Sequence, residues 1–465
     1  MTDISRVLDT ADKGLEQSLD RLFDLVRIPS ISTDPAYKAD CRRTAERIVA
    51  DLARLGFSAA LRDTPGHPMV VAHFEPKAAH GKVPHFLFYG HYDVQPPDPL
   101  DKWTTPPFEP QKRTGKDGVV CLYGRGTADD KGQLMTFVEA MRAWIETTGT
   151  LPIKATILIE GEEESGSPSL VPFLEANKAE LTCDAAFVCD TSMWDAKTPA
   201  ITTRLRGMVK DEITITGPRI DLHSGAYGGP AANPIRILSK LLSKLHDKNG
   251  KVTIPGFYEG VGEVPKEIKQ QWQKLKFSDR KFLKEVGLSV PAGEKGKGVL
   301  EQIWARPTAE VNGIWGGYTG AGTKTVIPSQ AHAKLTFRLV GKQRPEKILK
   351  AFRAFAKAEV PKDCRIEFAS YGSGSPASEI AETSPLIRKS AKALKDEFGR
   401  DTALIGSGGS IPIVRYFKDV LGMDSVLIGF GLNDDALHSP NEKYNLSSFH
   451  KGIRSWVRVL GEVAR

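Results

Sequence analysis

The chain has 465 residues, 40% of them hydrophobic and 26% charged, which is the composition of a soluble globular protein with enough length for two domains. No uninterrupted apolar run could span a bilayer, so no membrane partner is expected. The five cysteines are odd in number and never form a CxxC pair, which argues against a disulfide framework or a thiolate zinc site. The net charge is +7, and basic and acidic residues are mixed along most of the chain.

Helical patterns and apolar runs alternate over residues 1–200. The opening residues lack the basic flank and apolar block of a secretory signal, so a cytoplasmic location is expected. They predict an amphipathic helix that ends at Pro29, and a second helix is predicted over 41–55. Four strands and one further helix follow, the strands at 69–74, 85–90, 153–161 and 184–190 and the helix at 133–144. This alternation indicates an α/β sheet, largely parallel, with helices on its faces.

The pattern changes near residue 201. Two predicted strands, 208–217 and 331–340, alternate apolar and polar residues, with a helix over 235–245 between them. Such strands are typical of an α+β domain. The α/β character then returns, with a predicted helix at 385–398 and an apolar run at 425–431.

We therefore expect a catalytic domain in two segments, 1–200 and 376–465, separated by an inserted domain over 201–375. Within this insertion, the lysine-rich stretch 266–297 could suggest a nucleic-acid patch. Ile268, Trp272 and Leu275, however, have the spacing of one buried helix face. We predict an amphipathic helix with a solvated basic side, and no nucleic-acid partner.

The string GHYDVQ, at 90–95, directly follows the apolar run 86–89. Residues i and i+2 of a strand share one face, so His91 and Asp93 lie on the same side. His91 can bind a metal through one ring nitrogen while Asp93 accepts a hydrogen bond from the other. By itself, a His-x-Asp pair is more often an ordinary surface pair.

Four further clusters of metal-binding residue types follow GHYDVQ. They are GRGTADDKG at 124–132, EGEEESGS at 160–167, Asp190 at the end of 184–190, and LHSPNE at 437–442. Each has a simpler explanation: an acidic helix cap, a solvated acidic loop, a turn cap and a surface histidine. Open α/β sheets, however, bind ligands outside the carboxyl ends of their strands. Five such loops together predict a metal site of histidines and carboxylates, which suits zinc, with cobalt or manganese as substitutes.

Together these motifs resemble, over the whole chain, the M20 family of zinc peptidases and deacylases. The resemblance implies a zinc-peptidase-like catalytic domain with a mixed, largely parallel sheet, and an inserted α+β lid or dimerisation domain. It also implies two zinc ions per subunit: His91 and Asp190 would bind one, Glu164 and His438 the other, and Asp129 both. Glu163 would be the general base, Asp93 would orient His91, and the peptide bond from Asp129 to Asp130 would be cis.

The resemblance further implies a dipeptidase. Asp190 is Glu in many carboxypeptidase-like and deacylase members of the family, and DLHSGAYGG at 221–229 resembles the carnosinase-type cytosolic dipeptidases. It implies a homodimer in which His223 enters the partner's active site and stabilises the oxyanion. Arg338 would bind the substrate's C-terminal carboxylate, and Thr325 and Ser410 would also contact the substrate. Two alternatives remain: a deacylase of N-acyl amino acids or related amides, and a non-catalytic binding or scaffold protein on this fold.

Overall fold

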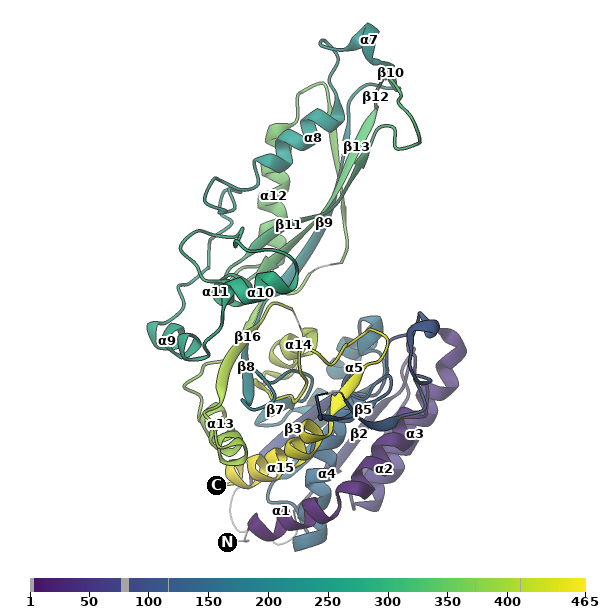
Figure 1. Ribbon diagram of the computed structural model, residues 1–465, viewed down its shortest axis with the longest axis vertical. Coiled ribbons are helices and arrows are strands. Elements are labelled where there is room, and N and C mark those ends of the chain that lie inside the picture. Colours follow the sequence, from purple (N-terminus) through teal and green to yellow (C-terminus); the bar gives the residue numbers. More distant parts are fainter. Residues whose placement is uncertain (1–3, 77–82, 116, 373, 410) are drawn as a thin grey trace. The chain divides into compact units, whose positions relative to one another are not determined.

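The computed structural model describes residues 4–76, 83–115, 117–372, 374–409 and 411–465 (Figure 1). The chain forms two compact units, the first made of Met1–Thr203, Ile380–Ile405 and Tyr416–Arg465, the second of Arg204–Glu379 and Gly406–Arg415. The chain passes between them within β8 (Ala200–Leu205), β16 (Ala403–Ser407) and α14 (Pro412–Leu421), and just after β15 (Ser378–Glu379). The roles of catalytic domain and of lid or dimerisation domain stay predictions.

A large mixed sheet forms the centre of the first unit, with strands in the order β1-β2-β6-β3-β7-β17-β8. These strands are β1 (Ser58–Arg62), β2 (Met69–Phe74), β3 (His85–His91), β6 (Lys154–Glu160), β7 (Ala185–Val188), β17 (Ser425–Leu427) and β8, and both β15 and β16 also pair with β8. The central neighbours β6, β3, β7 and β17 are parallel, and the outer pairs are antiparallel. The parallel strands are almost wholly buried, as expected for strands covered on both faces. The predicted mixed α/β fold is confirmed.

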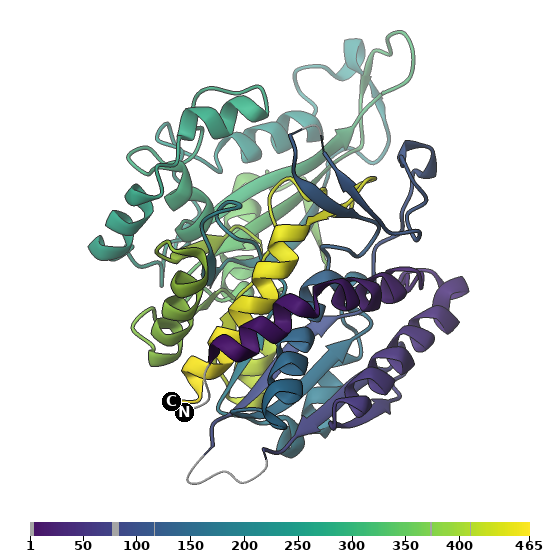
Figure 2. The ribbon, with the colours of Figure 1, turned by 60° about the horizontal axis from the view of Figure 1, so that its bottom comes forward.

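Helices pack around this sheet. They include α1 (Ile4–Lys13), α2 (Leu15–Val26), α3 (Lys38–Arg54), α4 (Lys131–Thr148), α5 (Leu170–Ala176), α6 (Lys178–Leu181), α13 (Pro385–Phe398) and α15 (Leu446–Val463). Both α1 and α4 pack against α15, and α1 lies alongside α15 in Figure 2. Trp456 of α15 is fully buried, with its ring 5.8 Å from that of Phe88 and 5.5 Å from that of Phe187. The last helix is thereby fixed to the central strands.

The opening helix differs from its prediction. The sequence predicts one helix up to Pro29, whereas the structure has two, α1 and α2, separated at Gly14. Glycine disfavours a continuous helix because its backbone loses the most conformational freedom on folding. The second helix ends at Val26, in keeping with the helix-disfavouring effect of Pro29 on the residue before it. Among the residues that the structure describes, no helix combines the length and the apolar character that a membrane span requires.

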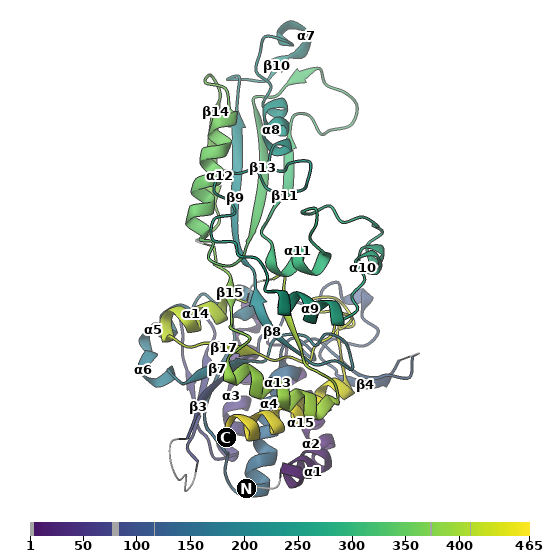
Figure 3. The same cartoon turned by 90° about the vertical axis from the view of Figure 1, so that its left-hand side faces the viewer.

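The second unit contains a four-stranded antiparallel sheet with strand order β11-β13-β9-β14, whose strands run side by side in Figure 3. These are β9 (Gly207–Thr216), β11 (Thr308–Gly316), β13 (Gln330–Leu339) and β14 (Arg365–Ser370). One face packs on α8 (Pro234–Ser243) and α12 (Pro345–Glu359), where Phe337 and Phe352 share a buried core. This arrangement leaves the other face of the sheet free of that core.

The lysine-rich segment of the second unit forms α9 (Lys266–Lys274), next to α10 (Asp279–Glu285) and α11 (Val299–Ala305). Ile268 and Trp272 are buried, as their spacing predicts. The ring of Trp272 lies 5.0 Å from that of Trp304. Because Trp272 belongs to the interior of the second unit, it cannot serve as a stacking platform for nucleic-acid bases.

Candidate metal centre

Seven of the predicted site residues lie together in the first unit, and each belongs to a loop at or near a strand end. His91 ends β3, and Asp93 follows that strand. Glu163 and Glu164 lie in the short turn Glu163–Ser165 after β6, and Asp190 follows β7. Asp129 precedes α4, and His438 precedes β18 (Lys443–Asn445). Since β6, β3 and β7 are neighbouring parallel strands, their carboxyl ends meet at one edge of the sheet. The sheet topology therefore brings the loops together.

Asp129 is shared by two groups of metal-binding residue types. Its Oδ1 lies 3.2 Å from His91 Nε2, and its Oδ2 lies 3.0 Å from His438 Nε2. Asp190 completes one group and Glu164 the other, and the ligand atoms within each group lie within 4.8 Å of one another. One carboxylate with an oxygen directed to each histidine is the arrangement that a pair of neighbouring metal ions requires. The peptide bond from Asp129 to Asp130 is cis.

Asp93 joins the two sides of this centre. His91 Nδ1 lies 3.1 Å from the backbone O of Asp93 and 3.3 Å from its Oδ1, which leaves Nε2 of that ring directed toward Asp129. The same carboxylate accepts hydrogen bonds from the backbone N–H groups of Glu163, at 3.3 Å, and Glu164, at 3.0 Å. Asp93 thus holds both the histidine ring and the glutamate turn in place.

The carboxylates of the centre disturb one another's protonation. Burial and the nearby charge of Asp129 raise the pKa of Asp190 to about 8. Burial also raises the pKa of Glu163; the charge of His91 opposes this effect, and the charges of Glu164 and Asp93 add to it. The neighbouring carboxylates of Asp129 and Glu164 raise the pKa of His438 to about 10. Added positive charge would favour the ionised forms of Asp190 and Glu163, whose pKa values are raised.

The residues fit a pair of divalent cations. Three carboxylates and two imidazoles are a borderline donor set of the kind that zinc prefers. Glu164 Oε1 is buried and accepts no hydrogen bond from the described residues, although His438 Nε2 lies 3.4 Å away. A buried carboxylate oxygen without a hydrogen bond is costly unless another group, such as a cation, compensates it. His438 has a φ of 58°, a left-handed conformation that non-glycine residues adopt rarely and that clusters at functional sites.

Glu442 is a residue of the centre that the sequence reasoning missed. It is fully buried, and its two oxygens accept hydrogen bonds from the backbone N–H groups of Gly126, Ala128 and Asp129 at 2.9–3.1 Å. Arg125 Nη1 donates to the same carboxylate at 2.8 Å. Glu442 therefore fixes the loop that presents Asp129. The motif LHSPNE contains it, but only the folded structure shows which backbone it binds.

Replacing Glu442 by Gln is expected to destabilise the first unit by about 3–5 kcal/mol, because the buried Arg125 loses its counter-charge and an amide cannot accept all of these hydrogen bonds. Urea unfolding of both proteins would measure the difference. Asp63→Asn is the matched control, since it removes only the exposed ion pair with Arg42 and should change stability by less than about 1 kcal/mol. Equal effects of the two changes would contradict this role of Glu442.

Gln95, the last residue of the GHYDVQ string, also belongs to the centre, although the sequence analysis assigned it no role. Its Nε2 donates to Glu164 Oε2 at 2.7 Å. This contact holds one oxygen of Glu164 and leaves the other on the side of His438. An amide at this position gave no signal in the sequence because its partner lies 69 residues away.

The remaining predicted residues belong to the second unit. His223 pairs with Val326 between β10 (Leu222–His223) and β12 (Val326–Ile327), and Thr325 O accepts a hydrogen bond from Ser224 N at 3.0 Å, so His223 and Thr325 are neighbours. Arg338 lies on β13, opposite Met208 of β9. Ser410 lies outside the described residues.

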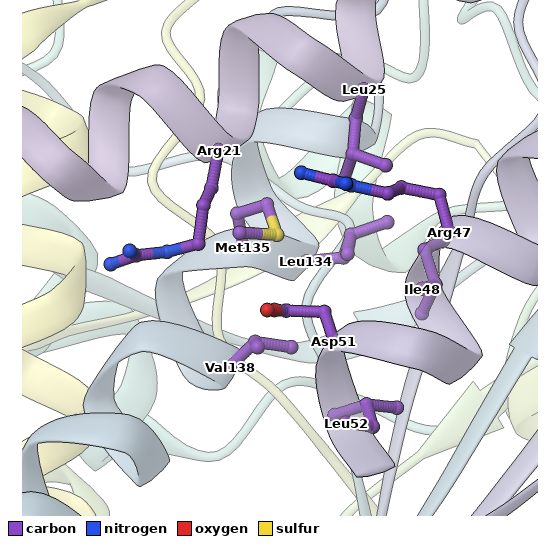
Figure 4. Close-up of a pocket in the computed structure, with 9 residues that line it drawn as sticks. All are labelled: Arg21, Leu25, Arg47, Ile48, Asp51, Leu52, Leu134, Met135 and Val138. Atoms are coloured by element: carbon purple, nitrogen blue, oxygen red, sulfur yellow. The ribbon is translucent and has the colours of Figure 1, made fainter. Parts of the chain in front are cut away.

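A separate hollow in the first unit offers no comparable chemistry. Figure 4 shows its lining, which comes from α2, α3 and α4 and includes Arg21, Arg47 and Asp51. Each of these three charges is already paired, Arg21 with Glu139, Arg47 with Asp24 and Asp51 with Arg142. No free charge among them remains for a ligand.

Comparison with known proteins identifies the family. Residues 87–462 match the model of peptidase family M20/M25/M40. The chain belongs to this family, as the sequence motifs predicted. It is 30% identical to the Cys-Gly metallodipeptidase DUG1 of Candida albicans, in an alignment that covers 97% of this chain and 95% of the relative. It is 27% identical to the human Beta-Ala-His dipeptidase, over 99% of this chain and 93% of that protein.

Solved structures agree with this assignment. The dipeptidase Dug1p of Saccharomyces cerevisiae superposes with a TM-score of 0.77 at 28% identity, covering 99% of this chain and 98% of that one. Human carnosine dipeptidase 1 gives a TM-score of 0.78 at 26% identity, with the same coverage. The metallo-carboxypeptidase Sso-CP2 of Sulfolobus solfataricus gives 0.79 at 28% identity, covering 96% of this chain and 99% of that one.

Proposed function

We propose that the protein is a metal-dependent dipeptidase that hydrolyses the peptide bond of dipeptides or short peptides. The observation that carries the proposal is Asp129, which directs one oxygen to His91 and the other to His438, at the centre of two groups of ligand-type residues. Two relatives that are similar over almost the whole chain are named as a Cys-Gly metallodipeptidase and a Beta-Ala-His dipeptidase. The deacylase and non-catalytic alternatives gain no support from these relatives.

Five residues would hold the metal ions: His91 and Asp190 at one position, Glu164 and His438 at the other, and Asp129 at both. We propose two zinc ions per subunit, with manganese or cobalt as substitutes. When bound, the ions polarise the scissile carbonyl and lower the pKa of a water molecule. Asp93 acts on His91 and on the glutamate turn, and so fixes the positions of the ligands.

Glu163 would carry the proton. It lies in the short turn after β6, next to Glu164, so the geometry of one turn sets the positions of base and ligand together. It takes a proton from the attacking water and then donates one to the leaving amine, as general base and general acid in turn. Burial raises its pKa toward the range in which a carboxyl group can perform both steps.

Four residues of the second unit would contact the substrate. Nδ1 of His223 accepts hydrogen bonds from Gly225 N and Ala226 N, so its ring proton lies on Nε2, on an exposed side chain. That N–H can donate to a developing oxyanion. Arg338 would bind the C-terminal carboxylate, and Thr325, beside His223, would contact the substrate with Ser410. We further propose a homodimer in which His223 serves the partner's site, and a cytoplasmic location.

A substrate panel tests the proposed function. The protein, supplied with zinc, manganese or cobalt in turn, should hydrolyse Cys-Gly, Beta-Ala-His or other dipeptides, with chelation abolishing turnover. N-acetylated amino acids and longer peptides are the comparison substrates, and the latter would reveal carboxypeptidase activity. Turnover of N-acetylated amino acids alone would establish a deacylase instead.

Mixing two inactive variants tests whether His223 acts across subunits. Glu163→Gln and His223→Ala, co-expressed with different tags, form mixed dimers in which one of the two sites has both Glu163 and a partner's His223. Random pairing should restore about a quarter of the wild-type activity. Each variant alone should remain almost inactive. Absence of restoration in purified mixed dimers would contradict the exchange of His223.

A further inference from the structure

Arg338 lies on the open face of the four-stranded sheet. The side chains of β13 alternate, so that Phe337 and Leu339 enter the core with α8 and α12 while Arg338 lies on the opposite face. Arg338 is half-buried, and it makes no hydrogen bond or ion pair with any residue that the structure describes. Burial lowers the pKa of this guanidinium. A partly desolvated cation without a protein partner is typical of a site for an anionic ligand.

A second arginine shares this face. Arg206 lies between β8 and β9, two residues before Met208, and Met208 is the residue opposite Arg338. Diagonal neighbours of this kind are about 7–8 Å apart on the same face. Burial, and then the charge of Arg338, lower the pKa of Arg206 to about 10. The charge of Glu310 opposes this shift, but the described residues provide no carboxylate ion pair for Arg206.

Arg206 also holds the loop that follows β16. Its Nε donates to Gly408 O at 3.1 Å, and its Nη1 donates to Arg306 O at 3.4 Å. A Cβ on Gly408 would lie only 3.1 Å from Arg206 Nη2, and one on Gly406 would lie 2.6 Å from the Cβ of Trp304. The glycines therefore allow the loop to pack closely against Arg206 and Trp304. The planar guanidinium suits this task because it can donate to two carbonyl groups in fixed directions.

We propose that Arg206 is a positioning residue for recognition of the substrate's C-terminal carboxylate. It fixes the loop segment 406–409 on the same side of the sheet as Arg338 and adds a second positive charge to that of Arg338. The repulsion between the two arginines weakens the free protein slightly and is relieved when a carboxylate binds. This inference rests on the proposed dipeptidase function and on the assignment of Arg338 as the group that binds the carboxylate.

The test compares one dipeptide with its own C-terminal amide. The dipeptide that the wild-type protein hydrolyses best in the panel, and its amide, are assayed with wild type, Arg206→Met, Arg206→Lys and Lys210→Met. Lys210 is the matched control, because it is an exposed cation on the same face of β9, opposite Thr336. Metal content and thermal unfolding are measured for each variant.

Arg206→Met is expected to lower kcat/KM for the free dipeptide by about tenfold or more, because KM rises. The same change should alter kcat/KM for the amide by less than about twofold. Arg206→Lys keeps the charge but loses the simultaneous hydrogen bonds to Gly408 O and Arg306 O. It should therefore keep only part of the wild-type preference for the free dipeptide over the amide. Lys210→Met should leave the preference unchanged. An equal fall in kcat for both substrates, or an unchanged preference in Arg206→Met, would overturn the inference. Equal wild-type hydrolysis of dipeptide and amide would also overturn it and leave the proposed function intact, whereas hydrolysis of neither would refute the function itself.

Discussion

Replacing Glu163 by Gln is expected to lower kcat by about 10²–10⁴-fold while the protein keeps its metal. Glutamine has the same shape, and the backbone N–H of residue 163 still donates to Asp93, so the turn should persist. The amide cannot accept a proton, however, so no side chain carries the proton from the attacking water to the leaving amine. Steady-state assays at saturating dipeptide, combined with metal analysis of the same sample, measure both parts of this expectation.

Glu175 provides the control for this change. It is an exposed glutamate on α5, in the same unit, and Glu175→Gln should leave kcat unchanged. The role of Glu163 would be refuted by near-normal turnover in Glu163→Gln. Loss of metal in that variant would instead show that Glu163 acts as a ligand.

Replacing Asp129 by Ala is expected to remove both metal ions, and with them all measurable turnover. Asp129 is the one carboxylate common to the two groups of ligand-type residues in the described structure, so its loss affects both positions. Even residues that merely orient ligands change metal affinity by about 10–100-fold when replaced, and a shared ligand should have a larger effect. Equilibrium dialysis against zinc would give the number of ions bound and their affinities.

His438→Ala separates the two positions. It removes one residue from the group of Asp129, Glu164 and His438, and leaves His91, Asp129 and Asp190 intact. This variant should retain one tightly bound ion, whereas Asp129→Ala should retain none. Two ions bound with wild-type affinity in Asp129→Ala would rule out the shared carboxylate.

The sequence could predict that the residues of the candidate metal centre lie together because two local signals combine. Strand and helix patterns define the sheet, and the rule that ligands bind outside the carboxyl ends of parallel strands puts the loops of His91, Glu164 and Asp190 at one edge. The motifs of the M20 family then define the residues within each loop. Neither signal depends on knowing how distant parts of the chain pack.

The supporting contacts could not be predicted in this way. Asp93 and Glu442 act by accepting hydrogen bonds from backbone N–H groups, and every residue except proline has such a group, so no side-chain pattern identifies the donor. Arg206 belongs to no motif. Its proposed role depends on a hydrogen bond to the backbone O of Gly408, about two hundred residues later in the chain. The break at Gly14 was likewise missed, because amphipathic periodicity continues across it.

His438 and Glu442 lie in the loop that precedes the final helix, and their partner Asp129 lies 309 residues before His438. On the ribosome, all strands of the large sheet emerge before this loop does. A nascent chain can therefore assemble His91, Asp129 and Asp190, but the loop of Asp129 still lacks the carboxylate that fixes it, and the second group lacks its histidine. The candidate site is therefore completed only when this late loop has folded against the loop of Asp129.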